Sequence, residues 1–236
     1  MLEIKNVTKK YGNKIAIKNI SLEIKKGEIF GFIGHNGAGK TTLIKAISGI
    51  HEFDEGDILI DGVSIIKSDV EYKKMLAYIP DNPDLYENLK GIDYLNFIAD
   101  IYEVEVQERE KLIKKYGEIF DIYKNLGDLI SSYSHGMKQK LAIISALIHD
   151  PKVLILDEPF VGLDPKSSKD LKDIMRNLCQ KGTIIFFSSH VLEVVEKLCD
   201  RVGIIKNGIL IKVGTTKEIT NSEDLESVFL EITNEK

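Results

Sequence analysis

Three apolar runs that do not alternate with polar residues constrain the fold of this chain most strongly. They are IFGFI at 29–33, VLIL at 153–156 and TIIFF at 183–187. A strand with one face in water alternates in polarity, whereas a strand covered on both faces does not. Such strands are typical of a parallel sheet between helices, and helical patterns separate these runs. The sequence therefore predicts an α/β fold with a mostly parallel sheet.

Shorter β-type runs fill the first sixty residues, and helical periodicity replaces them in the middle of the chain. The predicted strands of an N-terminal antiparallel β-subdomain are LEIKNV, ISLEI and GDILIDG. We expect one domain over 1–236, with a core made of 1–80 and 151–236 and an inserted α-helical subdomain at 81–150. The last ten residues, rich in Glu and Ser, are expected to fray.

Composition and charge narrow the class of protein. The two cysteines of this 236-residue chain, Cys179 and Cys199, match no metal or redox spacing, which favours a reducing compartment. The N-terminus alternates in polarity and so lacks the apolar core of a signal peptide, and no run approaches the roughly 18–20 apolar residues of a membrane span. The net charge of −5 argues against a surface that coats nucleic acid. We expect a cytoplasmic protein.

The segment GFIGHNGAGKTT at 31–42 lies between a predicted strand and a predicted helix. Gly34, Gly39, Lys40 and Thr41 fit the phosphate-binding pattern G-x4-G-K-[ST], which requires that context. The glycines let backbone N–H groups surround phosphate oxygens, the lysine reaches the β- and γ-phosphates, and the hydroxyl binds Mg²⁺. The alternative is a glycine turn that caps a helix, which needs no Lys-Thr pair at the first turn.

Two carboxylates end the predicted strand in VLILDEP. Asp157 is a candidate ligand of Mg²⁺ through its water shell, and Glu158 is a candidate to polarise an attacking water. The alternative is a pair of acidic residues in a turn before a proline. Hydrolysis of a nucleoside triphosphate needs mainly positioning and charge stabilisation, so a lysine, a magnesium site and a carboxylate that orients water suffice.

A further segment, YSHGMKQK at 133–140, distinguishes among the proteins that share these two features. Ser134 is a good N-cap for the predicted helix that follows, and Gly136 lets the backbone approach an anion there. The segment therefore indicates a second phosphate-binding helix end. The alternative is an ordinary capped helix in a bundle.

Five ordered motifs resemble those of the nucleotide-binding subunit of an ATP-binding cassette (ABC) transporter, and the resemblance covers essentially the whole chain. The motifs are the phosphate loop, YSHGMKQK, LDEP, VGLD and the lone His190 after TIIFFSS. The resemblance implies a P-loop NTPase core, ATP and Mg²⁺ as cofactors, and two subunits that pair head to tail.

The resemblance also implies individual roles. Ser134 and Gly136 would contact the partner's ATP, Tyr11 would stack on adenine, Asp164 would link the two sites at the interface, and His190 would bond the γ-phosphate and orient the water. The last three have simpler alternatives: a strand-edge aromatic, an Asp-Pro turn and a core histidine. The residues implied to bind the phosphates are Gly34, His35, Asn36, Gly37, Ala38, Gly39, Lys40, Thr41 and Thr42.

Two positions depart from the family pattern. In the segment YSHGMKQK, which corresponds to the family's signature motif, His135 replaces the first glycine, although Ser134 and Gly136 remain. Asp81 stands where the family usually has a glutamine that touches Mg²⁺ and the water. We expect Asp81 to be a catalytic-site residue and a metal ligand, because the metal would neutralise its added charge. The alternative is a residue that only forms a turn.

The leading functional prediction is an ATPase that drives a separate membrane permease, together with a second cassette of the same or a sister kind. It would lie on the cytoplasmic face of the membrane, and no nucleic-acid partner is expected. The signature, the residue at position 81 and the length resemble the exporter branch of the family. One alternative is a soluble ABC-type ATPase that acts on ribosomes or nucleic acid. The other is a small-molecule phosphotransferase, but that function would leave Ser134, Gly136, Asp164 and His190 without a joint purpose.

Four apolar or aromatic residues after position 81 have two interpretations. Leu85, Tyr86, Leu95 and Phe97 would either form a groove for a cytoplasmic helix of the permease or belong to the core of the helical subdomain.

Overall fold

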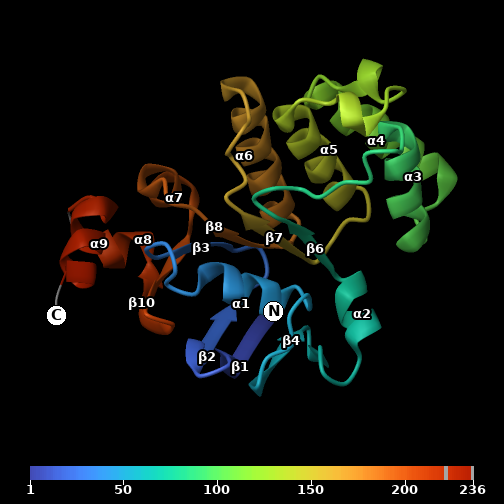
Figure 1. Cartoon of the computed structure of the whole chain (residues 1–236). Helices are drawn as coiled ribbons and strands as arrows, with labels where there is room; N and C mark the ends of the chain where they lie inside the picture. The colour runs from blue at the N-terminus through green and yellow to red at the C-terminus, as the bar shows by residue number, and fades with distance from the viewer. Residues whose placement is uncertain (221–222, 235–236) are drawn as a thin grey trace.

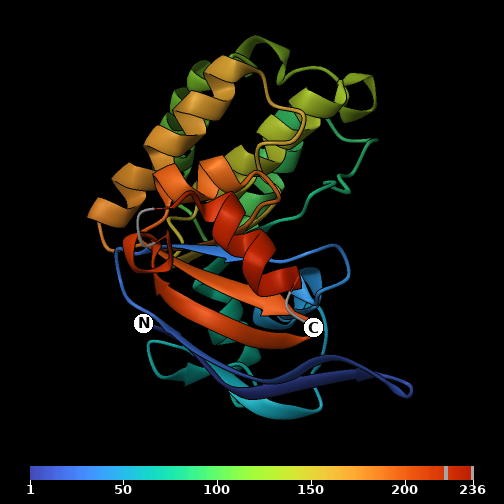
Figure 2. The same cartoon turned by 90° about the vertical axis from the view of Figure 1, so that its left-hand side faces the viewer.

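The structure is a computed structural model that describes residues 1–220 and 223–234. Two β-sheets and the helices around them form layers (Figures 1 and 2). Helices lie above a central sheet, and a second sheet closes the lower side. The predicted α/β fold, with a mostly parallel sheet, an antiparallel N-terminal sheet and an inserted group of helices, is confirmed.

The central sheet has the strand order β10-β9-β3-β8-β7-β6; the strands from β9 to β6 run parallel to one another, and β10 pairs antiparallel with β9. Its strands are β3 (Ile29–Ile33), β6 (Leu76–Ile79), β7 (Val153–Asp157), β8 (Ile184–Ser188), β9 (Arg201–Lys206) and β10 (Ile209–Thr215). Every residue of β3, β7 and β8 is buried. Alternate side chains join opposite cores, since Leu154 and Leu156 pack with the upper helices whereas Val153 and Ile155 pack below.

The second sheet is antiparallel, with the order β2-β1-β4-β5. Its strands are β1 (Leu2–Tyr11), β2 (Lys14–Ile24), β4 (Glu55–Ile60) and β5 (Val63–Ser64). Helix α1 (Lys40–Ile47) lies between the two sheets, where Leu43 and Ile44 share a core with Ile4 and Phe30. This packing fixes the start of α1 at the end of β3, where the phosphate loop lies.

The remaining helices cover the upper face and the two sides of the central sheet (Figure 1). They are α2 (Asp69–Lys74), α3 (Gly91–Ile101), α4 (Val106–Ile119), η1 (Tyr123–Asn125), η2 (Ile130–Ser132), α5 (His135–Leu147), α6 (Pro165–Gln180), α7 (Leu192–Leu198), α8 (Thr216–Thr220) and α9 (Leu225–Asn234). None of the helices in the described ranges is both long and apolar enough to cross a membrane.

Helices α3 to α5 lie between β6 and β7 in the chain, where the sequence predicts an inserted helical subdomain. One continuous apolar cluster joins Leu95 of α3 and Leu141 of α5 to Leu154 and Phe187 of the central sheet. Because the core is shared, the division at residues 80 and 150 stays a prediction.

Two parts of the chain differ from the expectations. Strand β6 was not predicted, because its four residues, LAYI, are too few to show a clear period. The expected fraying of the last ten residues is wrong for 227–234, which belong to α9. Val228 and Phe229 are buried, and the backbone N–H of Leu225 donates to Glu196 of α7 at 3.0 Å, so packing orders this polar-looking segment. Residues 235–236 lie outside the described residues.

Candidate active site

The phosphate loop leaves the carboxyl end of β3 and enters α1 at Lys40, at the sheet edge where open α/β sheets bind ligands. Gly39 has φ 109°, and a Cβ there would lie 2.8 Å from the carbonyl oxygen of Ala16. Only glycine fits that position without moving the backbone. The loop is thus a rigid turn whose N–H groups lie at the start of a helix.

Lys40 occupies the centre of the loop. Only 9% of the residue is exposed, and Nζ donates to the carbonyl oxygens of Gly34 and His35, the latter at 3.3 Å. Burial lowers the pKa of Lys40, and the charges of Glu158 and Asp157 oppose this effect. The ammonium group is therefore partly desolvated, which strengthens its interaction with an anion.

Asp157 ends β7 and is buried, with 5% of the residue exposed. Thr41 Oγ1 donates to its Oδ2 at 3.3 Å, and Ser188 Oγ donates to its Oδ1. Ser188 reaches this carboxylate because it lies opposite Asp157 in the parallel pairing of β7 with β8. The carboxylate is therefore fixed from two sides, by α1 and by β8.

The hydroxyl of Thr41 and the carboxylate of Asp157 are the kind of oxygen donors that Mg²⁺ uses when phosphate oxygens and waters supply its other ligands. Within residues 1–220 and 223–234, no group of three or more His, Cys, Asp or Glu side chains is placed to hold a metal. This donor set fits a metal shared with a nucleotide, rather than one held in an all-protein cage.

Glu158 follows directly and contacts His190. Glu158 has φ 50°, a left-handed conformation that is costly for a non-glycine residue and is found at functional sites. His190 Nδ1 lies 2.9 Å from Glu158 Oε2, and the His190 backbone N–H donates to the same oxygen at 3.3 Å. The His190 side chain is 64% exposed. It is thus not a core histidine.

A cavity of about 580 Å³ lies beside the phosphate loop, Asp157 and Glu158, and the described residues that line it do not include His190, Gly34 or Ala38. Its lining residues are Tyr11, Lys14, Ile15, Ala16, His35, Asn36, Gly37, Gly39, Lys40, Thr41, Thr42, Asp81, Asp157, Glu158 and Asn207. Tyr11, at the end of β1, is 47% exposed and lies at an edge-to-face angle to His51. Tyr11 and Asp81, which are far apart in the sequence, therefore reach the same cavity as the phosphate loop.

The sequence analysis missed four lining residues and one supporting residue, Ser188. Lys14, Ile15 and Ala16 follow the β1–β2 turn, and Asn207 lies in the tight turn between β9 and β10. The Asn-Gly pair at 207–208 signals a hairpin. What the sequence does not show is that β9 lies beside β3, which brings this turn to the phosphate loop.

Ser134, Gly136 and Asp164 are not among the described residues that line the cavity. Ser134 is the N-cap of α5 and accepts from the Met137 N–H at 3.3 Å. Asp164 is the N-cap of α6 and pairs with Lys140 at 2.8 Å. The hydrogen bond from Lys140 holds the pKa of Asp164 far below its usual range, and bonds from Ser167 act in the same direction.

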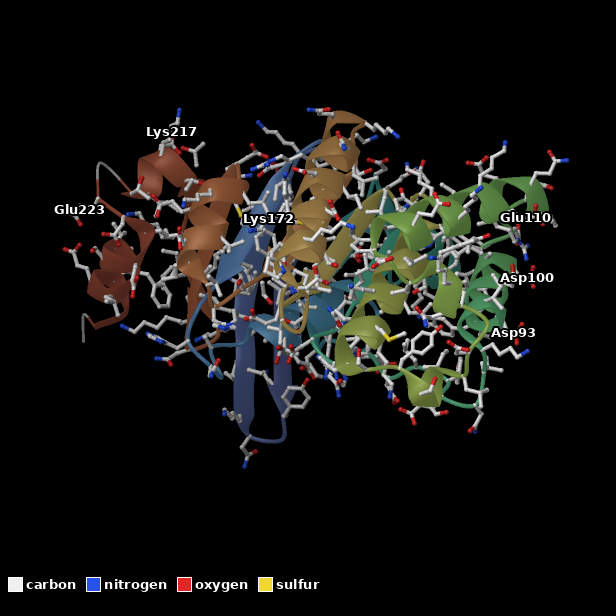
Figure 3. All side chains as sticks on the ribbon, turned by 90° about the horizontal axis from the view of Figure 1, so that it is seen from above. Asp93, Asp100, Glu110, Lys172, Lys217 and Glu223 are labelled. Atoms are coloured by element: carbon white, nitrogen blue, oxygen red, sulfur yellow. The ribbon has the colours of Figure 1, made fainter. Side chains whose placement is uncertain are left out.

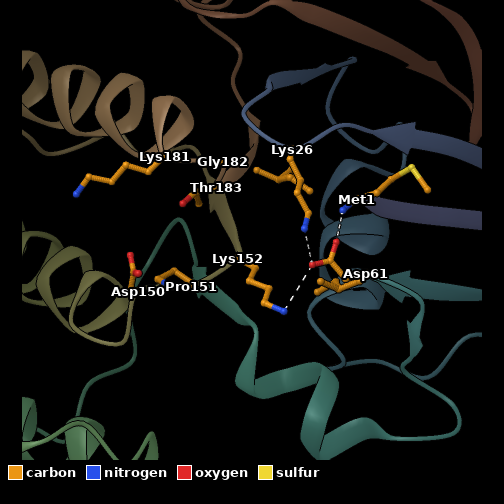
Figure 4. Close-up of a pocket in the computed structure, with 11 residues that line it drawn as sticks. Met1, Lys26, Asp61, Asp150, Pro151, Lys152, Lys181, Gly182 and Thr183 are labelled. Carbon is orange, nitrogen blue, oxygen red and sulfur yellow. Dashed lines mark hydrogen bonds and ion pairs between the residues drawn. The ribbon is translucent and has the colours of Figure 1, made fainter.

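A second cavity, of about 220 Å³, lies at the opposite edge of the central sheet, where β7 and β8 begin (Figure 4). Asp61 meets three cations there: the Met1 amine at 2.5 Å, Lys26 at 3.0 Å and Lys152 at 3.5 Å. Partial burial raises the pKa of Asp61, but hydrogen bonds from the Met1 amine and Lys26 outweigh this and lower it to about 2. None of the phosphate-loop residues contributes to this cavity, so it is not the candidate active site.

Comparisons with known proteins agree with this geometry. The ABC transporter family model matches residues 17–161. The linearmycin resistance ATP-binding protein LnrL of Bacillus subtilis (strain 168) is 38% identical over 219 residues, 93% of this chain and 70% of that protein. The lantibiotic transport ATP-binding protein SrtF of Streptococcus pyogenes is 35% identical over 233 residues, 97% of this chain and 96% of that protein. A solved ATP-binding subunit of an ABC transporter superposes with a TM-score of 0.95 at 32% identity, covering 98% of this chain and 99% of that one.

This chain belongs to the ABC transporter family. It is an ATP-binding subunit of a transporter and an ATP hydrolase, as the motifs predicted. The relatives are named as transporter subunits, so the alternative of an ATPase that acts on ribosomes or nucleic acid finds no support. The roles of individual residues stay predictions and are developed below.

Proposed function

We propose that two copies of this cassette, or this chain and a sister cassette, pair head to tail around two Mg-ATP molecules and drive a separate membrane permease. The observation that carries the pairing is the position of the signature residues. Ser134 and His135 are exposed at the start of α5, and neither lines the cavity of its own subunit. A capped helix start attracts anions. A phosphate held by the partner subunit fits this exposed end.

Within each cavity the residues divide the chemistry of hydrolysis. Lys40 would exchange the carbonyl oxygens of Gly34 and His35 for β- and γ-phosphate oxygens. Thr41 and Asp157, with Asp81 at the rim, would hold Mg²⁺, which neutralises charge that develops on those oxygens.

Glu158 would accept a proton from the attacking water, because its carboxylate lines the same cavity. The contact of His190 with Glu158 would orient that carboxylate, and His190 would bring a second hydrogen-bonding group to the γ-phosphate. Tyr11 would stack on the adenine at the far side of the cavity.

The contact with the permease would lie on α3 and the segment before it. Leu85 and Leu95 are buried and belong to the core, whereas Tyr86 and Phe97 are 60% and 42% exposed. The rings of Tyr86 and Phe97 meet edge to face, with centroids 5.9 Å apart. Exposed neighbouring aromatic rings are typical of a protein interface. A short cytoplasmic helix with apolar side chains fits this surface.

Asp93 and Asp100 also lie on α3 (Figure 3), and positions 93, 97 and 100 share one face of that helix. Asp100 already pairs with Arg109 at 2.5 Å. Asp93, four residues before Phe97, would be left to meet a basic residue of the permease. The relatives named for lantibiotic transport and linearmycin resistance support an exporter that removes an antimicrobial compound, with this subunit on the cytoplasmic face of the membrane.

Glu158→Gln tests the pairing, because it should keep the cavity and the metal site while removing the base. We expect sedimentation of this variant to show a monomer without nucleotide and a dimer with Mg-ATP. Lys40→Ala is the control, since it should bind ATP weakly and stay monomeric in both conditions. A monomer at saturating Mg-ATP, with binding verified, contradicts the pairing.

The same Glu158→Gln protein, loaded with Mg-ATP, serves as bait in detergent extracts of its native cells. A polytopic membrane protein in stoichiometric amount is the expected result, and Phe97→Asp should lose it while keeping the ATP-dependent dimer. Capture of ribosomes or DNA-binding proteins in its place would overturn the transport proposal.

A further inference from the structure

Gln139, one turn into α5, is fully buried, with 0% of the residue exposed. Across residues 1–220 and 223–234, no hydrogen-bond partner reaches either its Oε1 or its Nε2. A buried amide without partners is rare because it loses its bonds to water and gains none. In this conformation the unpaired amide of Gln139 therefore costs free energy. A small movement of a neighbouring polar group would remove that cost by forming a hydrogen bond.

Helix geometry shows which neighbour faces Gln139. Side chains three and four residues apart share one face of a helix, so Gln139 points between the directions of Gly136 and His135. Both of these approach Gly162: a Cβ on Gly136 would lie 2.8 Å from the Gly162 carbonyl oxygen, and a Cβ on Gly162 would lie 2.6 Å from His135 Cδ2. Gln139 therefore faces the segment between β7 and α6, residues 158–164.

This segment is anchored at its ends and by two side chains in the middle. The Glu158 N–H donates to the Ser188 carbonyl at 3.2 Å, and Asp164 is held by Lys140 at 2.8 Å. Between these points the Val161 N–H donates to Glu158 at 3.2 Å and the Leu163 N–H donates to Phe160 at 3.4 Å, and the side chains of Phe160 and Leu163 pack against the core. Val161 and Gly162 are exposed between them, so movement is easiest at these two residues.

The first residue of the segment, Glu158, lines the ATP cavity. A nucleotide in that cavity therefore acts on the segment at one end, while Lys140 holds the other end on α5. The peptide groups in between offer N–H donors and carbonyl acceptors, which match the two kinds of hydrogen-bonding atoms in an amide side chain.

We propose that Gln139 is a positioning residue: when ATP binds, Val161 and Gly162 shift against α5, one of their peptide groups bonds the Gln139 amide, and this fixes Glu158 for catalysis. The inference rests on the proposed role of Glu158 as the base. It gives the start of the signature helix a function in its own subunit, in addition to the proposed contact with the partner's ATP.

The test compares Gln139→Met, of similar length but without polar atoms, with Ser145→Ala on the same helix. Ser145 is also buried, but its Oγ donates to the Ala142 carbonyl at 2.8 Å. We expect Gln139→Met to raise the melting temperature without nucleotide by a few degrees, to lower kcat about tenfold and to leave the KM for ATP within about twofold. Ser145→Ala should keep kcat and should not raise the melting temperature.

An unchanged kcat for Gln139→Met would overturn the proposal. A lower melting temperature or failure to fold would also overturn it, because the amide would then already be bonded before ATP binds. Failure of the proposed function gives a different result: Glu158→Gln would keep turning over ATP, or would not form a dimer, whatever residue occupies position 139.

Discussion

Ser188→Ala should perturb the proposed metal site without touching a residue that would meet the nucleotide. Ser188 is fully buried, and its hydroxyl donates to Asp157 Oδ1. A hydrogen bond to a charged group contributes about 1.5–3 kcal/mol, and its loss leaves one oxygen of a buried carboxylate without its donor. We expect the free energy of unfolding to fall by about 2 kcal/mol, or about 4–8 °C in melting temperature for a chain of this size.

Ser189→Ala is the matched control. Ser189 is also buried, but its Oγ accepts from the neutral backbone N–H of Val191 at 3.1 Å, so its loss should cost about 1 kcal/mol or less. Urea unfolding measures both losses, and the Mg²⁺ concentration that gives half-maximal ATPase activity reports the metal site. That concentration should rise about tenfold in Ser188→Ala, as for other residues that orient a metal ligand, and stay unchanged in Ser189→Ala. Equal stabilities, or equal Mg²⁺ dependence, would refute the reasoning.

Two further predictions follow from the geometry. His190→Ala should lower kcat about 10²-fold and leave ATP binding nearly unchanged, because His190 contacts Glu158 but not the phosphate loop. Steady-state kinetics measures the change in kcat, and binding of ATP to the His190→Ala protein measures the affinity. Asp61 has a folded pKa of about 2, below its unfolded value near 4, so its ion pairs stabilise the fold above pH 4 and this contribution is lost as the pH falls toward 2. Because Lys26 and Lys152 are more than half exposed, Asp61→Asn should cost only about 1 kcal/mol at pH 7, and the difference from the wild type in urea unfolding should shrink below pH 4.

The sequence predicted the parts of the site that local chemistry determines. The phosphate loop needs its glycines and its Lys-Thr pair at adjacent positions, and Asp157 and Glu158 end a strand that is recognisable by its apolar residues. The signature helix was predictable for the same reason, since its N-cap serine and its glycine are neighbours. Each of these signals lies within about ten residues.

Contacts between distant segments were not predictable. Ser188 supports Asp157 because β8 pairs with β7 in one register, and the Asn207 turn reaches the cavity because β9 pairs with β3. Parallel pairing leaves no short-range trace of which strands are neighbours. The burial of Gln139 was not predictable either, since the sequence around a helical amide does not show that its side chain is buried.

The first turns of α5 lie between two segments that both begin at the cavity of the candidate active site. Lys138 pairs with Glu87, in the segment that starts at Asp81, and Lys140 pairs with Asp164, in the segment that starts at Glu158. Two residues along a helix turn the side chain by about 200°, so the two lysines hold opposite sides of α5. A γ-phosphate between Asp81 and Glu158 would therefore act on both sides of the helix that carries Ser134. The catalytic state of one cavity would thus set the position of the signature that the proposed partner subunit contacts.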